Sequence, residues 1–197
     1  PQTHVRDRVE MKIGSLFTGI GGLELGVCDT VISIVAYGND IEWIAETDGN
    51  VLKILEHSTI FHGVPNLGDV TKIDWTMVPD VDCITGGTPC QDFSHPGTRK
   101  GLEGEKSSLL FTFIEAVKAK KPDYVLWENV TGALTKGAYD VLLDALNEAD
   151  YSTSSVILPA SSLGMPHKRA RIFVFAERTE EWVTPFNDQL VQVRHDP

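Results

Sequence analysis

The sequence contains little cysteine: only Cys28, Cys83 and Cys90 occur in 197 residues. None of them belongs to a CxxC pair or to a cysteine–histidine cluster, so no zinc-binding motif is recognisable. The odd number and irregular spacing also argue against a disulfide framework. We therefore expect no structural metal and a reduced, cytoplasmic setting.

Long apolar runs are also lacking. No stretch approaches the roughly 18 residues typical of a membrane span, and no signal-peptide pattern is present. We therefore expect no membrane partner. The hydrophobic fraction of 42% and the charged fraction of 23% are ordinary for a globular protein, and the length suits one domain with a full core.

Positive charge is scarce, because 17 Lys and Arg residues stand against 28 Asp and Glu residues, for a net charge of -11. Such a charge repels phosphates, so an extended nucleic-acid surface is disfavoured and any such surface must be local. Basic residues concentrate at Arg99–Lys100, Lys106, Lys118–Lys121 and His167–Arg171.

Strand-like and helix-like segments alternate along the chain. Apolar runs predict strands at 12–17, 41–46, 67–70, 81–85, 124–127, 154–158 and 171–176. Helical spacing and capping residues predict helices that begin near Gly22 and that span 48–57, 107–120 and 137–149. This order predicts a parallel α/β sheet with helices on both faces, formed by residues 11–176. Residues 1–10 would be an arm or a remnant, and residues 177–197 a C-terminal extension.

The end of the fourth predicted strand carries the most informative segment, Gly86-Gly87-Thr88-Pro89-Cys90-Gln91. Two glycines and a proline after an apolar run predict a tight loop with a thiol at its tip. Reacting groups gather at the carboxyl ends of parallel strands, so this cysteine is a candidate nucleophile. Taken alone, a free cysteine is more often a small buried residue.

Three other strand ends carry residues suited to a nucleoside cofactor. The glycine turn at 17–22 follows the first strand and lacks the lysine of a phosphate-binding P-loop. Glu46 ends the second strand, where an acid typically binds ribose hydroxyls, although it could be a solvated strand end. Asp69 could accept a hydrogen bond from an adenine amino group, or it could be a turn or cap residue.

A carboxylate and two arginines form a further candidate group. Glu128 directly follows the apolar strand 124–127, where a partly desolvated carboxyl group is suited to donate a proton. Alternatively, it is a structural carboxylate bonded to backbone amides. Arg169 and Arg171 share one side of an extended segment and could hold Glu128 or a phosphate, or could be a solvated basic stretch.

Together these features resemble the DNA (cytosine-5)-methyltransferase family from residue 12 to about residue 176. The family's order is kept by the glycine turn, Glu46, Gly68-Asp69-Val70, Pro89-Cys90-Gln91, Glu128-Asn129-Val130 and the Arg-x-Arg element at 169–171. The resemblance implies a Rossmann-like methyltransferase fold with a mostly parallel seven-stranded sheet. It also implies S-adenosylmethionine (SAM) as methyl donor and double-stranded DNA whose target cytosine is flipped out. Short phage and prophage members without an evident target-recognition domain are similar, which implies the cytoplasm of a bacterial or phage-infected cell.

The resemblance also implies roles for individual residues. It makes Cys90 the nucleophile that adds to C6 of cytosine and Glu128 the acid on N3, with Arg169 and Arg171 completing the catalytic group. The implied donor-binding residues are Phe17, Gly19, Gly21, Gly22, Glu46, Asp69, Pro89 and Leu109. The residues expected to contact nucleic acid are Gln91, Ser94, Arg99, Lys100, Lys106 and Lys168.

Other functions stay open from the sequence alone. An RNA cytosine-5 methyltransferase of the same lineage would share these motifs. A SAM-binding half-enzyme that needs a partner chain, or a homo-oligomer, is a further alternative. A nicotinamide dehydrogenase would share the glycine turn but would not account for Pro89-Cys90-Gln91 together with Glu128. Two positions depart from the family pattern: His167 stands where glutamine is usual, and Thr47 where a large side chain often stacks on adenine.

Overall fold

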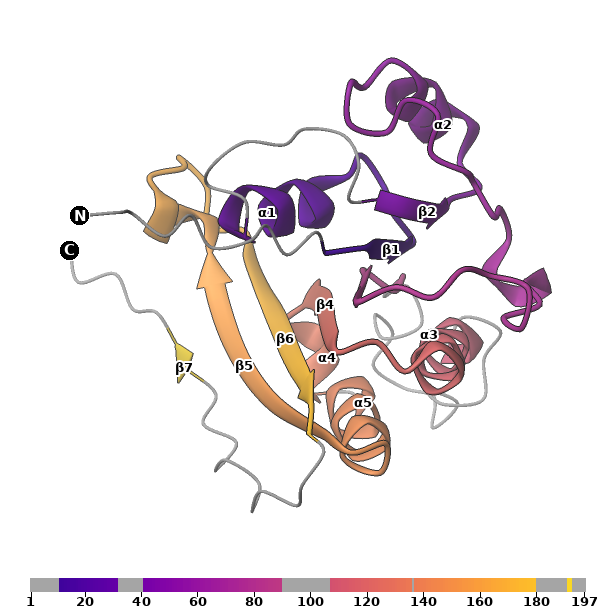
Figure 1. The fold of residues 1–197 in the computed structure, drawn as a ribbon. Coiled ribbons are helices and arrows are strands. Elements are labelled where there is room, and N and C mark those ends of the chain that lie inside the picture. Colours follow the sequence, from indigo (N-terminus) through magenta and orange to yellow (C-terminus); the bar gives the residue numbers. More distant parts are fainter. Residues whose placement is uncertain (1–10, 32–40, 90–106, 136, 180–190, 193–197) are drawn as a thin grey trace, which may run out of the picture.

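The computed structural model describes residues 11–31, 41–89, 107–135, 137–179 and 191–192. Its centre is a seven-stranded sheet in the order β2-β1-β3-β4-β6-β5-β7 (Figure 1). The strands are β1 (Ile13–Leu16), β2 (Ile41–Ala45), β3 (Cys83–Gly86), β4 (Tyr124–Val130), β5 (Tyr151–Pro159), β6 (Ala170–Arg178) and β7 (Val191–Gln192). The helices are α1 (Gly22–Val31), α2 (Gly49–Glu56), α3 (Ser107–Lys120), α4 (Gly132–Thr135) and α5 (Ala138–Asn147).

Most strand pairs in this sheet are parallel. β1 pairs in parallel with β2 and with β3, β3 pairs in parallel with β4, and β5 pairs in parallel with β7. Only β6 runs antiparallel to its neighbours, β4 and β5. The predicted α/β class and mostly parallel seven-stranded sheet are therefore confirmed.

Helices cover both faces of the sheet, as predicted. Successive residues of a strand point to opposite faces, so one strand can contact helices on both sides. In β3, the Thr85 side chain reaches Glu24 of α1, whereas a Cβ at the next residue, Gly86, would meet Phe113 of α3. Figure 1 shows α1 on one side of the sheet and α3, α4 and α5 on the other. The helix predicted to start at residue 48 is capped there, since the Asp48 carboxylate accepts hydrogen bonds from the amides of Asn50 and Val51 in α2.

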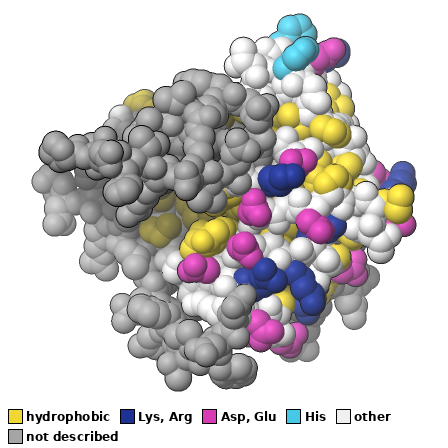
Figure 2. All heavy atoms as spheres, viewed as in Figure 1, with side chains coloured by type: hydrophobic (Ala, Val, Ile, Leu, Met, Phe, Trp, Pro, Cys, Tyr) yellow, Lys and Arg dark blue, Asp and Glu magenta, His cyan; other side chains and the backbone are white. Residues whose placement is uncertain are grey.

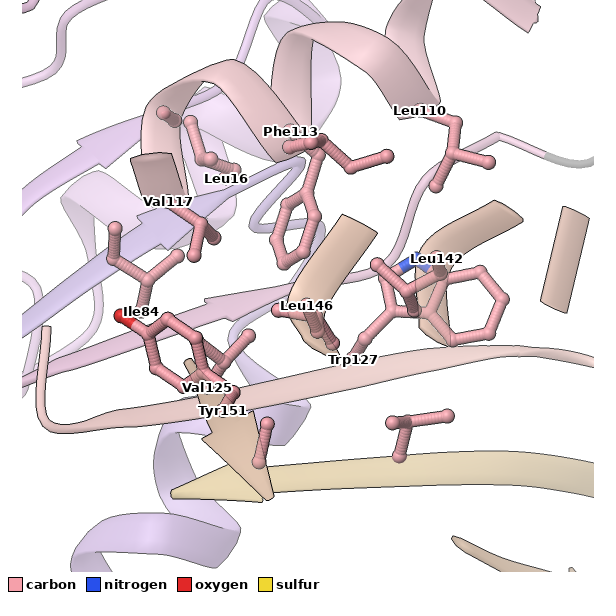
Figure 3. Close-up of a cluster of buried hydrophobic side chains, with 14 of the residues drawn as sticks. Leu16, Ile84, Leu110, Phe113, Val117, Val125, Trp127, Leu142, Leu146 and Tyr151 are labelled. Atoms are coloured by element: carbon pink, nitrogen blue, oxygen red, sulfur yellow. The ribbon is translucent and has the colours of Figure 1, made fainter. Parts of the chain in front are cut away.

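The main hydrophobic core lies between the sheet and the helices α3 and α5. Figure 3 shows the α3 side chains directed toward β1, β3 and β4. Phe113, Trp127 and Leu142 are completely buried in this core. The apolar spacing that predicted helices at 107–120 and 137–149 marks the residues that fill it, and burial of such side chains contributes roughly 1.5–3 kcal/mol each.

Three expectations about the strands need correction. Residues 67–70 do not form a strand: Gly68 has a positive φ of 75°, and Asp69 caps a 3-10 turn at Val70–Lys72. An isolated bridge beside β2 is formed instead by Asn66, the residue before this segment, with Ile44. The seventh strand is β7, from within the segment 177–197. Finally, β4 continues to Val130, because its pairing with β6 keeps residues 128–130 extended.

Among the described residues, no helix is both long enough and apolar enough to cross a membrane. The same part of the chain contains no group of three or more His, Cys, Asp or Glu side chains arranged to hold a metal ion.

We predict that Gly14→Ala destabilises the fold. A Cβ at residue 14 would lie 2.1 Å from the ring of Trp43, which is fully buried and has no room to move. Overpacking of this kind typically costs about 1–3 kcal/mol, and urea denaturation measures the loss of unfolding free energy.

Gly49→Ala is the matched control, because a Cβ there meets no atom within 4 Å and residue 49 begins a helix. It should change the unfolding free energy by no more than about 0.5 kcal/mol. Equal stability of the two variants would contradict the packing described for Gly14.

Candidate functional site

The candidate site lies at the edge of the sheet where four parallel strands end. β1 leads into the glycine turn, β2 ends immediately before Glu46, and β3 leads into Gly87 and Pro89. Because β1, β2, β3 and β4 run in the same direction, these segments meet at one edge. The fold therefore brings the separate sequence motifs to a common place.

The glycine turn needs its glycines for two different reasons. Gly19 and Gly21 both have positive φ values, of 54° and 83°, which other residues adopt only with strain. A Cβ on Gly21 would also lie 2.2 Å from the ring of Phe61. At Gly19 and Gly22 an added Cβ would meet nothing within 4 Å. The turn therefore packs on Phe61 on one side and leaves space beside Gly19 and Gly22.

Glu46 joins the glycine turn to the end of β2. Its Oε2 accepts a hydrogen bond from the Gly19 amide at 2.9 Å, and its Oε1 accepts from the amides of Thr47 and Asp48 at 2.7 and 2.8 Å. A carboxylate offers about four acceptor positions, so Oε2 keeps one for a ligand hydroxyl. Glu46 is thus fixed by backbone amides and is still able to accept a further hydrogen bond.

The other predicted donor-binding residues differ in their surroundings. Phe17 and Leu109 are partly buried against the main core, and Pro89 is exposed. Asp69 is engaged locally: it accepts hydrogen bonds from the amide and hydroxyl of Thr71 and forms an ion pair with Lys72. The Thr71 hydrogen bonds and the Lys72 charge hold the pKa of Asp69 below its usual range. This arrangement matches the cap alternative considered for Asp69.

The segment before the predicted nucleophile is anchored to β4. The hydroxyl of Thr88 accepts hydrogen bonds from the Trp127 indole at 3.0 Å and from the Asn129 amide at 3.1 Å. Asn129 also donates to the carbonyl of Thr88. The predicted residues that follow lie outside the described part of the chain: Cys90, Gln91, Ser94, Arg99, Lys100 and Lys106.

Glu128 and Arg171 form an ion pair across β4 and β6. Arg171 Nε lies 2.9 Å from Glu128 Oε1, and both side chains are about three-quarters buried, with exposed fractions of 22% and 24%. A Cβ on Gly87 would lie 3.3 Å from Glu128 Oε2, so this carboxylate is beside the loop that follows β3. Of the two alternatives for the arginines, Arg171 holds Glu128, whereas Arg169 and Lys168 are exposed.

An apolar hollow of about 520 Å³ lies on the same sheet face as Glu128. It is lined by side chains from β4, β5 and β6, including Leu126, Val156, Phe173 and Phe175. Among the described residues that line it, the polar ones are two serines of β5, Ser154 and Ser155. These described residues offer hydrophobic contact and no acid, base or thiol.

Sequence reasoning missed a buried polar cluster beneath the glycine turn. Glu24, only 1% exposed, accepts hydrogen bonds at Oε1 from Ser15 at 2.8 Å and from Thr85 at 2.5 Å. Its Oε2 is buried and has no hydrogen-bond partner among the described residues. Burial raises the pKa of the Glu24 carboxyl, and the hydrogen bonds from Thr85 and Ser15 only partly offset this. Two hydroxyl residues within apolar strands, Ser15 and Thr85, were the available signal.

Among the described residues, most Lys and Arg side chains form ion pairs. Lys120, grouped with other basic residues in the sequence, is 6% exposed and binds Asp80 and the carbonyl of Val78. Lys118 pairs with Glu148. On the face shown in Figure 2, the described Lys and Arg side chains are interspersed with Asp and Glu and form no continuous basic patch.

Comparison with known proteins identifies close similarity over most of the chain. The sequence model of the family described as C-5 cytosine-specific DNA methylase matches residues 11–196. The orphan methyltransferase M.SPRI of Bacillus phage SPR is 31% identical over 188 residues, which cover 90% of this chain and 41% of that protein. The type II methyltransferase M.HhaI of Haemophilus parahaemolyticus is 31% identical over 168 residues, covering 84% of this chain and 48% of that protein. The chain thus spans less than half the length of these two relatives.

Solved structures confirm the Rossmann-like methyltransferase fold. A mutant of Spodoptera frugiperda DNMT2 superposes with a TM-score of 0.72 at 21% identity, covering 95% of this chain and 55% of that one. The Entamoeba histolytica methyltransferase EhMeth superposes with a TM-score of 0.75 at 19% identity, covering 96% and 58%. At these identities the likeness concerns the fold alone.

We predict that Glu24→Gln changes how stability depends on pH. The folded protein keeps the Glu24 proton to a higher pH than the unfolded chain, whose carboxyl has a pKa near 4.5. As the pH rises above that value, the unfolded chain releases a proton that the folded protein retains, so the unfolding free energy falls. Glu24→Gln carries no such proton and removes this loss.

Urea denaturation between pH 4.5 and pH 8 measures the effect. The stability of Glu24→Gln relative to the unmodified protein should increase as the pH rises through the range that starts at 4.5. A constant difference across this range would mean that the folded-state pKa of Glu24 is not raised.

Proposed function

Because the chain belongs to the C-5 cytosine-specific DNA methylase family, we propose that it transfers a methyl group from SAM to C5 of cytosine in DNA. The observation that carries this proposal is the position of the Glu128–Arg171 pair beside Gly87, three residues before Cys90. The ion pair and the loop share one edge of the sheet with the glycine turn and Glu46. An acid, a thiol and a nucleoside-binding turn can therefore act on two substrates that meet at this edge.

The residues at the glycine turn suit SAM. The space beside Gly19 and Gly22 allows a ligand to approach the backbone closely, and the remaining acceptor position of Glu46 suits a ribose hydroxyl. Phe17 would pack against the adenine, with Leu109 and Pro89 at the border of the same pocket. Asp69 would contribute only if its cap and its ion pair with Lys72 were rearranged. When bound, SAM supplies an electrophilic methyl group.

The proposed chemistry depends on Cys90 and Glu128. The Cys90 thiolate adds to C6 of cytosine while Glu128 donates a proton to N3, which makes C5 nucleophilic enough to accept the methyl group. Loss of the C5 proton then restores the aromatic ring and expels Cys90. A thiolate suits both steps because it is a good nucleophile and a good leaving group. Arg171 would keep Glu128 oriented through their ion pair.

The target cytosine has to leave the helical stack, because C6 cannot be reached inside a duplex. With a net charge of -11, the chain has few basic residues to hold the DNA. We propose that Arg99, Lys100 and Lys106 contact phosphates together with the exposed pair Lys168 and Arg169. Gln91 and Ser94 would lie against the flipped nucleotide. The matched part of this chain corresponds to less than half of each of these relatives, and we propose that a partner chain or a second copy adds further DNA contacts.

We predict that Cys90→Ala abolishes methyl transfer. Without the thiol, C6 receives no nucleophile and C5 stays unreactive. The measurement is incorporation of labelled methyl groups from SAM into plasmid DNA and, in parallel, into RNA. DNA containing 5-fluorocytosine should also trap the unmodified protein covalently, because C5 then carries no removable proton.

A melting curve of Cys90→Ala, compared with that of the unmodified protein, shows whether the variant is folded. Continued turnover by folded Cys90→Ala would remove the proposed mechanism. Methylation of RNA in place of DNA would support the RNA enzyme of the same lineage.

We predict that Glu46→Ala weakens SAM binding by about tenfold to a hundredfold, because a charge-assisted hydrogen bond contributes roughly 1.5–3 kcal/mol. Isothermal titration calorimetry measures the dissociation constant. Glu42→Ala is the control: it removes a carboxylate from the same strand, but one that pairs with Lys12. Equal SAM affinity of the two variants would exclude Glu46 from the donor site.

A further inference from the structure

We propose that Glu24 is a positioning residue that couples the SAM-binding turn to the strand that carries the nucleophile. This inference rests on the proposed function and extends it to a residue that lies beneath the site. It concerns how the two halves of the site are held together, one half being the turn after β1 and the other the loop after β3.

One oxygen atom of Glu24 joins three elements of the fold. Glu24 lies in the first turn of α1, and its Oε1 accepts hydrogen bonds from Ser15 in β1 and Thr85 in β3. The hydroxyl of Ser15 also lies 2.8 Å from that of Thr18, within the glycine turn. All four side chains are at least nine-tenths buried. A continuous chain of hydrogen bonds therefore runs from the turn, through Glu24, to β3.

The two ends of this chain lead directly to the proposed reactants. Thr18 is between Phe17 and Gly19, both of which would contact SAM. Thr85 precedes Gly86 and Gly87, and the same strand leads to Cys90 five residues later. On the β2 side the turn is held by Glu46, which accepts a hydrogen bond from the Gly19 amide. On the β3 side Glu24 supplies the side-chain hydrogen bonds, to Ser15 and to Thr85.

Stability alone does not account for a carboxyl group at this position. Oε2 is buried without a hydrogen-bond partner among the described residues, and an unsatisfied buried polar atom is destabilising. A well-packed apolar side chain of similar size often stabilises a fold as well as a buried polar group does, or better. An apolar side chain, however, cannot accept hydrogen bonds from the hydroxyls of Ser15 and Thr85, which Glu24 accepts at one oxygen atom. The geometry of the site is thus the property that Glu24 serves.

Thr85 is the residue through which Glu24 contacts β3. Thr85 donates to Glu24 on one side of β3, whereas its neighbour Gly86 faces Phe113 on the other. Without the acceptor, the Thr85 hydroxyl would lose this partner and the Ser15 hydroxyl would keep only that of Thr18, so the side-chain link between β3 and the turn would be broken. Because reacting atoms must be held at close to contact distance, a small shift has a large effect on rate.

The test compares Glu24→Leu, which removes the acceptor, with Glu24→Gln, which keeps a carbonyl oxygen of the same shape. The full chain is titrated with SAM by calorimetry, and methyl transfer to DNA is followed in a single turnover at saturating SAM. For Glu24→Leu we expect SAM affinity and the single-turnover rate each to fall by about tenfold or more. Loss of one or two hydrogen bonds of ordinary strength produces an effect of this size. Glu24→Gln should stay within about threefold of the unmodified protein in both measurements.

Tyr139→Phe is the matched control, because it removes a buried hydrogen bond between Tyr139 of α5 and Ser155 of β5, away from the turn. This variant should lower the melting temperature and leave SAM affinity unchanged. Thr85→Val provides a second test if Glu24→Leu does not fold, because it deletes one donor while Glu24 stays in place. It should show the same loss of SAM affinity to a smaller degree.

Each outcome separates this inference from the proposed function. If the unmodified chain bound no SAM, the proposed function would fail and this inference with it. If the unmodified chain bound SAM and folded Glu24→Leu bound and reacted equally well, only the positioning role would fail. An equal loss of affinity in Tyr139→Phe would likewise overturn it, since the effect would then be one of general stability.

Discussion

Parallel pairing around β1 is the constraint on which the rest of this structure depends. β1 pairs in parallel with β2 on one side and with β3 on the other, and β3 pairs in parallel with β4. Backbone hydrogen bonds fix the strands in register, so the segments that follow them emerge at one edge. The glycine turn, Glu46, the loop after β3 and Glu128 come within reach of one another for this reason, although up to about a hundred residues separate them in sequence.

The sheet distributes apolar and polar residues unequally between its two faces. On the α3 and α5 face, Trp127, Phe113 and Leu142 form a continuous apolar core. On the α1 face, the buried residues near the strand ends include Ser15, Glu24 and Thr85, which bind one another. The apolar core supplies most of the free energy of folding, because the net contribution of a buried hydrogen bond is only about 1 kcal/mol. The polar cluster instead fixes positions, since hydrogen bonds are directional and apolar contacts are not.

The charge distribution limits how the proposed binding of DNA could occur. Several lysines, including Lys118 and Lys120, serve ion pairs and loop anchoring, so they are engaged with the protein itself. In the part of the chain that the structure describes, Lys168 and Arg169 are exposed basic residues next to Arg171. Binding that depends on few phosphate contacts is weak and only moderately sensitive to salt. Contacts from a longer polypeptide, a partner or a second copy would therefore have a large effect on affinity.

The sequence by itself determined the α/β class, the bounds of α3 and the principal motifs of the site, because each of these depends on residues that are close together in the chain. Apolar spacing at 107–120 predicts a helix wherever the helix packs, and the glycines at 17–22 predict a turn. The segment 67–70 was predicted wrongly because its apolar residues resemble a strand, whereas Gly68 and Asp69 turn the chain locally. Strand β7 has only two residues and is defined by its pairing with β5, so no local pattern marked it.

Only the tertiary structure decided which residues would meet. It paired Glu128 with Arg171 and not with Arg169, and it placed Thr85 against Glu24, 61 residues away in the chain. It also placed Asn129 against Thr88, 41 residues away. These contacts depend on the register of neighbouring strands and on the face to which each side chain points, since a shift by one residue reverses the face. Register is a property of the folded sheet as a whole. The sequence therefore identified the chemical groups, whereas the fold determined which of them are in contact.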